Sequence, residues 1–237
     1  MIALVLVPRS WVQALGIPLW VWDPLSISLR AALEATLVVS VIGIALAYLL
    51  AKGHFPGRRV IETICSLPMG LPPTVVGWYL LTALGGPGPI RDAELHLFGH
   101  PLTFTFNGIV VAQIVESFPY CLRYSRAAIS GVDARFEQAA RVMGLSRRRI
   151  PLLVTLPLAR RGIVAGIAMG FGRALGDFGA TMVVSGSVPM ATTMPIALYE
   201  AVFYGSHQQA MVLALVQLGA AFATLLGVGR LGRVRAF

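Results

Sequence analysis

Long apolar blocks separated by short polar stretches are the main pattern along this chain of 237 residues. Several blocks exceed the roughly 18 apolar residues that mark a membrane-spanning helix. The pattern predicts an all-α integral membrane protein with five transmembrane helices. Their expected ranges are about 26–51, 60–84, 104–122, 158–184 and 207–229. Residues 1–25 are expected to form a short N-terminal segment, either interfacial or a partial further span, and residues 26–237 one transmembrane domain.

The charge composition supports the membrane assignment. Only 12% of the residues are charged, whereas soluble domains carry about 25%. The net charge of +9 alone could indicate a nucleic-acid partner. However, most of the 19 Lys and Arg residues fall in three zones, 52–59, 123–161 and 230–235, which alternate with nearly uncharged zones. This is the positive-inside pattern, and it predicts an outer N-terminus, a cytoplasmic C-terminus and no nucleic-acid binding.

Three prolines interrupt the second apolar block: Pro68, Pro72 and Pro73. Proline inside a helix frees a carbonyl group and bends the axis. At membrane depth such groups are tolerated where they face protein or a water-filled cavity. The block is therefore expected to be either part of a channel wall or a kink that serves packing.

The basic loop between the third and fourth blocks contains a short predicted helix at 133–143. Asp133 can cap its start and Gly144 can end it. One face is expected to carry Phe136, Ala140 and Met143. Such a helix outside the membrane is suited to a partner's groove, although a solvated linker or a membrane-surface helix has the same pattern.

Ionisable residues within the apolar blocks form a second set of candidates. Arg173 and Asp177 lie one helical turn apart, so they can pair with each other. Charged groups at membrane depth face a partner or a water-filled cavity. The pair is therefore expected either to fix helix packing or, through Arg173, to attract an anion. Glu116 is expected to pair with Arg123 or with another helix.

Several classes of chemistry are not indicated. The four histidines do not stand at metal-ligand spacings, and Cys65 and Cys121 lie in apolar stretches, so neither a metal nor a catalytic centre is expected. No Gly-x-x-x-x-Gly-Lys-Ser/Thr sequence occurs. The chain is therefore not expected to cradle ATP phosphates by this route, and no cofactor is expected.

The cytoplasmic loop resembles the signature of ABC importer permeases, which is Glu-Ala-Ala, three residues, Gly, nine residues and Ile-x-Leu-Pro. Here Ala139-Ala140 precede Gly144 at this spacing, and nine residues lead from Gly144 to 154–157, Val-Thr-Leu-Pro. Gln138 and Val154 depart from the signature. The resemblance implies a coupling loop at about 131–157 that docks on a cytoplasmic ATPase. The implied contact residues are Glu137, Ala139, Ala140, Arg141, Gly144 and Leu145.

Three further stretches, 66–77, 172–181 and 192–199, resemble segments of molybdate and sulfate permeases. The resemblance implies the type I importer permease fold and translocation of molybdate by alternating access through a homodimeric channel. Sulfate, thiosulfate or tungstate transport by the same family remains open, as does an ATP-independent channel or secondary anion transporter. The expected pore or gate residues are Pro72, Thr74, Gly77, Arg173, Asp177 and Thr181.

The same resemblance implies a transport subunit rather than an enzyme, with ATP hydrolysis on a separate ATPase subunit, and it implies a set of partners. These are a second copy of the chain, two cytoplasmic ABC ATPase subunits, an extracytoplasmic oxyanion-binding protein and the lipid bilayer. The expected location is the inner or plasma membrane of a prokaryote, with several passes.

Overall fold

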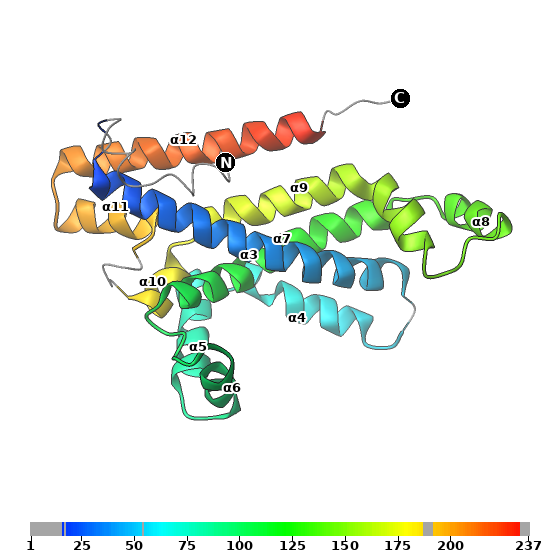
Figure 1. The fold of residues 1–237 in the computed structure, drawn as a ribbon, viewed down its shortest axis with the longest axis horizontal. Coiled ribbons are helices and arrows are strands. Elements are labelled where there is room, and N and C mark those ends of the chain that lie inside the picture. Colours follow the sequence, from blue (N-terminus) through cyan, green and yellow to red (C-terminus); the bar gives the residue numbers. More distant parts are fainter. Residues whose placement is uncertain (1–15, 17, 54, 187–191, 233–237) are drawn as a thin grey trace.

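Four long helices run lengthwise through the molecule (Figure 1). They are α3 (Leu19–Lys52), α7 (Phe106–Ser130), α9 (Leu156–Leu175) and α12 (His207–Gly232). The computed structural model describes residues 16, 18–53, 55–186 and 192–232, and within these ranges every regular element is a helix. The predicted all-α class is confirmed.

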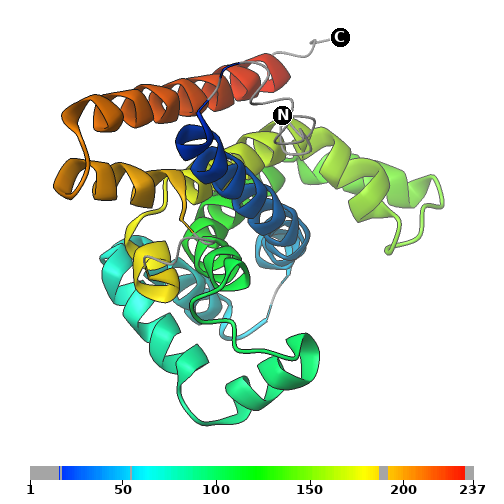
Figure 2. The same ribbon diagram turned by 60° about the vertical axis from the view of Figure 1, so that its left-hand side comes forward.

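Shorter helices lie at the ends and at one side of the long ones. They are α4 (Arg58–Gly70), α5 (Pro73–Gly85), α6 (Pro89–Phe98), α8 (Ala134–Val142), the π-helical turn η1 (Pro151–Thr155), α10 (Gly179–Ser185) and α11 (Met194–Phe203). Helix α8 extends past the ends of α7 and α9, whereas α11 lies at the opposite end (Figures 1 and 2). The two ends of the bundle are therefore structurally distinct.

The proline-rich second block forms two helices rather than one continuous helix. The chain bends by 113° between α4 and α5. Leu71 is extended, and Pro72 and Pro73 lie at the start of α5. Proline at these positions has no N–H to continue the first helix, and its fixed φ suits the first turn of the next one. The predicted interruption is confirmed, and its angle exceeds a simple kink.

The helices differ in extent from three of the predicted spans. Helix α3 begins at Leu19, not near residue 26, and Pro24 lies inside it. Helix α7 continues beyond residue 122 to Ser130, since Cys121, Leu122, Ser125 and Ile129 bury one of its faces. The fourth block stops at Leu175, and α10 starts at Gly179. Residues 1–15, part of the predicted N-terminal segment, lie outside the described ranges.

A helix also occurs where an outer loop was expected, at 185–206. Helix α11 begins at Met194, with Pro195 in its first turn, a position that favours proline. The Met194 N–H donates to Ser28 Oγ of α3 at 2.7 Å, and both residues are fully buried. This bond anchors α11 to the first long helix.

The number of membrane spans is a separate question from the number of helices. Among the residues that the structure describes, two helical stretches qualify as spans by length and hydropathy, Leu19–Lys52 and Pro151–Leu175, and the bent pair α4–α5 makes a third if it is one span. The five-span arrangement with an outer N-terminus stays a prediction.

Helices α7 and α9 approach closely along a glycine stripe: Gly162, Gly166 and Gly170. A Cβ at Gly166 would lie 3.0 Å from Ser125 Oγ, and one at Gly170 would lie 3.6 Å from Cys121 Cβ. Small residues at a spacing of four let membrane helices approach this closely. The contact continues into a core formed by α3, α7 and α9: Ala47, Leu50, Leu122, Ile129, Ala159 and Ile163.

Candidate functional site

Helix α8 is capped at both ends, as the loop sequence predicted. The Asp133 carboxylate accepts a hydrogen bond from the Arg135 N–H at 2.9 Å. At the other end, Gly144 has φ +86° and the Leu145 N–H donates to the Ala140 carbonyl at 3.0 Å. This is the Schellman arrangement, in which a left-handed residue ends the helix.

The exposed surface of α8 differs in part from the predicted one. Phe136 and Met143 are exposed, as is Val142 at 89%. Ala140 is buried at 4%, so it does not share their surface. Of the predicted ATPase contacts, Ala139, Arg141 and Gly144 are exposed and Leu145 is half-buried. Ala140 therefore does not share one exposed face with Phe136 and Met143, because the helix turns that side toward the protein, and its contact with the ATPase stays a prediction.

Glu137, another predicted contact, also faces inward. Glu137 is only 8% exposed. Its Oε1 accepts a hydrogen bond from Thr155 Oγ1 at 2.9 Å. Lys52 Nζ lies 3.0 Å from the same oxygen and also donates to the Val132 carbonyl at 3.2 Å. The carboxylate therefore joins α8 to the membrane helices and is turned away from the free surface.

Arg173 lies between two buried carboxylates. Its Nη2 pairs with Glu116 Oε2 on α7, and its Nη1 lies 3.4 Å from Asp177 Oδ1. Glu116 thus pairs with another helix, whereas Arg123 Nη1 lies 3.7 Å from Met69 Sδ. A guanidinium already shared by two carboxylates attracts a further anion weakly, so the cluster is better suited to holding helices together than to binding an oxyanion.

Asp177 occupies the non-helical link between α9 and α10. Its Oδ2 accepts a hydrogen bond from the Thr181 N–H at 3.0 Å, and Thr181 Oγ1 donates to the Asp177 carbonyl at 3.0 Å. Both residues are fully buried. The carboxylate satisfies a free N–H group at the start of α10, which stabilises the break in the helix.

Two reciprocal glycine contacts join α10 to α5. A Cβ at Gly77 would lie 2.9 Å from Ala180 Cα, and a Cβ at Gly179 would lie 2.9 Å from Pro73 Cβ. Gly77 is therefore a packing position inside the protomer. Of the predicted pore residues, Gly77, Asp177 and Thr181 are enclosed, Arg173 is partly exposed, and Pro72 and Thr74 are exposed. Gly77, Asp177 and Thr181 thus lie together inside the protein, away from its exposed surface.

A cavity of about 280 Å³ lies beside Arg173, between α7, α9 and α12. Its polar lining consists of Tyr120, Arg173, Gln217 and Thr224. Gln217 Nε2 donates to the Leu175 carbonyl at 3.4 Å, while its buried Oε1 has no partner. Sequence reasoning did not identify Gln217, although a polar residue in the otherwise apolar fifth block was a usable signal.

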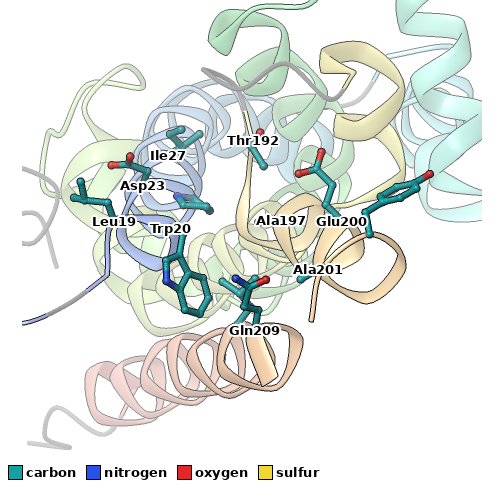
Figure 3. A pocket seen from close by; sticks show the side chains of 13 residues that line it. Leu19, Trp20, Asp23, Ile27, Thr192, Ala197, Glu200, Ala201 and Gln209 are labelled. Carbon is teal, nitrogen blue, oxygen red and sulfur yellow. The ribbon is translucent and has the colours of Figure 1, made fainter. Parts of the chain in front are cut away.

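A larger pocket of about 480 Å³ lies at the end of the bundle opposite α8, between the starts of α3 and α12 and helix α11. Figure 3 shows Asp23 on the α3 side and Glu200 on the α11 side. Sequence reasoning missed this pocket because it depends on α11. Within the described residues, no group of three or more His, Cys, Asp or Glu side chains could hold a metal ion.

Comparison with known proteins identifies the fold and the family. The chain is 37% identical over 220 residues to the molybdenum transport system permease protein ModB of Escherichia coli (strain K12), covering 91% of this chain and 96% of that protein. It is 32% identical over 206 residues to a Chlorokybus atmophyticus protein described as a probable sulfate transport system permease protein cysT, covering 85% and 71%.

The fold resembles a chain in the crystal structure of a bacterial alginate ABC transporter in complex with alginate pentasaccharide-bound periplasmic protein. The TM-score is 0.70 at 16% identity, covering 89% of this chain and 77% of that chain. The predicted importer permease fold and membrane location are confirmed. The model of the family described as binding-protein-dependent transport system inner membrane component matches residues 40–230. The chain therefore belongs to this family of inner-membrane transport components.

Proposed function

We propose that this chain is the permease subunit of an ATP-driven molybdate importer and that two copies form the translocation path. The observation that carries the proposal is α8. It is a capped helix with an exposed apolar tip, it stands at one end of the bundle, and it lies in a chain 37% identical to a molybdenum transport permease. An isolated apolar tip of this kind suits insertion into a groove of a partner protein.

The mechanism is alternating access, with the chemical energy supplied by two cytoplasmic ATPase subunits. ATP binding closes the ATPase pair and draws the two α8 helices together. The five spans of each copy, with the N-terminus outside, then open toward the outer side. There an oxyanion-binding protein releases its ligand, and hydrolysis restores the inward-facing state.

The pore residues divide into two groups. The exposed positions Pro72 and Thr74 on α5 are the candidates for lining the path between the two copies. The enclosed positions Gly77, Asp177 and Thr181 hold α5 against the broken segment α9–α10. Arg173 pairs with both buried carboxylates and so links α7 to the α9–α10 break.

Sulfate transport is the second candidate, because the chain is 32% identical to the sulfate-type permease named above. Molybdate and sulfate are both tetrahedral dianions. Selection between them is therefore expected to take place mainly in the binding protein.

The test is uptake of radiolabelled molybdate into proteoliposomes that contain this chain, its ATPase and its binding protein. Sulfate and tungstate serve as competitors, and Gly144→Asp serves as the uncoupled control. Uptake that requires ATP, and that an inserted and folded Gly144→Asp variant loses, supports the proposal. Uptake that continues without the ATPase contradicts it and indicates a channel or a secondary carrier. Stronger inhibition by sulfate than by unlabelled molybdate favours the second candidate.

A further inference from the structure

Three elements from distant parts of the chain meet at the Glu137 carboxylate. Glu137 belongs to α8, Thr155 ends η1 just before α9, and Lys52 is the last residue of α3. Lys52 Nζ is 3.0 Å from Glu137 Oε1, and Thr155 Oγ1 is 2.9 Å from the same atom. A single carboxylate oxygen thus accepts from two membrane helices.

The contact between Lys52, Glu137 and Thr155 is largely buried, unlike an ion pair at the protein surface. The Lys52 and Glu137 side chains are 20% and 10% exposed, and Thr155 is fully buried. Exposed pairs contribute little, whereas partly desolvated pairs with further hydrogen bonds depend strongly on both partners. Lys52 also lies at the C-terminal end of α3, where a cation interacts favourably with the helix dipole.

Chain connectivity gives the contact its significance. Helix α8 is joined covalently to α7 through a short link and to α9 through η1, so both helices follow its movement through the backbone. Helix α3 continues into α4 instead, and eighty positions separate Lys52 from Val132, whose carbonyl it also binds. Movement of α8 can therefore reach α3 by two routes: through the packing of α3 on α7 and α9, and directly through the contact of Lys52 with Glu137.

We propose that Lys52 is a positioning residue that links the coupling helix to α3 through Glu137, so that α3 moves with α8 when the ATPase closes. The inference rests on the proposed function for the identity of α8 as the coupling helix. Glu137 is then a transmitting group on the inner side of α8, and the residues of the outer side, such as Val142, are left to meet the ATPase.

The test compares four variants in the reconstituted transporter: Lys52→Met, Glu137→Gln, the double variant, and Lys52→Arg. The measured quantity is oxyanion transported per ATP hydrolysed. We expect Lys52→Met and Glu137→Gln each to lower this ratio about tenfold, within the usual range for coupling between sites. The double variant should be no worse than either single one, because both remove the same link. Lys52→Arg keeps the charge and should retain most of the ratio.

Arg59→Met is the matched control, because it removes one exposed positive charge from the same end of the bundle. It should leave the ratio unchanged. A Lys52→Met transporter with the wild-type ratio overturns the inference. Additive losses in the double variant also overturn it, since they mean that the two residues act separately.

A second measurement separates this inference from the proposed function. Hydrogen–deuterium exchange of the α8 peptides in the detergent-solubilised protein requires no substrate. We expect faster exchange in Lys52→Met and Glu137→Gln, and wild-type exchange in Lys52→Arg and Arg59→Met. If wild-type protein transports none of the three oxyanions, the proposed function fails, while the exchange data still decide whether Lys52 holds α8. Unchanged exchange in Lys52→Met overturns the link itself.

Discussion

Gly162 of α9 lies so close to Ala128 of α7 that a Cβ added at residue 162 would stand 2.3 Å from the Ala128 Cβ. The contact belongs to the stripe of Gly162, Gly166 and Gly170 along α9. In a membrane, helix association depends on close packing, because lipid is as apolar as the side chains themselves. The stripe is therefore expected to determine how α7 and α9 are held together.

Gly162→Leu should separate these two helices. The side chain has no room, and overpacking of a tight contact costs about 1–3 kcal/mol or more. The matched control is Gly172→Leu, on the same helix, where an added Cβ meets nothing within 4 Å. We expect Gly162→Leu to lower the thermal unfolding temperature in detergent by several degrees and Gly172→Leu to leave it nearly unchanged. Equal effects of both variants would contradict the packing role.

Arg173→Met should destabilise the protein strongly, because it leaves the buried carboxylates of Glu116 and Asp177 without their cation. Breaking a buried ion pair in this way costs about 3–5 kcal/mol. Replacement of all three groups by neutral ones, Glu116→Gln with Arg173→Met and Asp177→Asn, should cost less than Arg173→Met alone. Chemical denaturation in detergent measures both. A triple variant less stable than the single one would show that the three side chains have a role beyond charge compensation.

Ser28→Ala should loosen α11 from α3, because the buried Met194 N–H loses its acceptor. An unsatisfied buried donor costs about 1–3 kcal/mol. Ser40→Ala is the control on the same helix, since Ser40 Oγ donates only within its own helix, to the Thr36 carbonyl. Limited proteolysis near residues 192–206 should be faster in Ser28→Ala. If Ser40→Ala raises cleavage as much, the anchoring role is refuted.

The left-handed conformation of Gly144 predicts a graded series of substitutions. At φ +86°, a β-branched residue is strained, whereas asparagine tolerates this region. No side chain of this chain crowds the position, so an uncharged replacement should act through the backbone, whereas the carboxylate of Gly144→Asp also adds a negative charge at the surface proposed to meet the ATPase. We expect Gly144→Asn to retain most ATP-dependent transport and Gly144→Val to lose it. The backbone strain in Gly144→Val should destabilise the folded end of α8 by about 1–3 kcal/mol. Equal transport by both variants would show that the cap of α8 is not needed.

The features that depend on neighbouring residues could be predicted from the sequence. The apolar blocks indicated a membrane protein, the prolines at 72 and 73 indicated a broken segment, and Asp133 with Gly144 defined the ends of a short helix. Each follows from local chemistry: hydropathy over about 20 residues, a missing N–H group, or a side chain that caps its own helix. The predicted ATPase contacts on α8 stay predictions, because they concern a partner.

The features that depend on distant residues were decided by the tertiary structure. Burial against the α9 glycine stripe extends α7 to Ser130, and Ser28 holds the start of α11, which sequence reasoning took for a loop. Glu137 and Ala140 lie on the inner side of α8 because Lys52 and Thr155 approach from elsewhere in the chain. Local sequence determines that a helix forms and where it is capped. The rotation of that helix, and hence which side chains meet a partner, is set by long-range packing and by the pairing of charges that cannot stay buried alone.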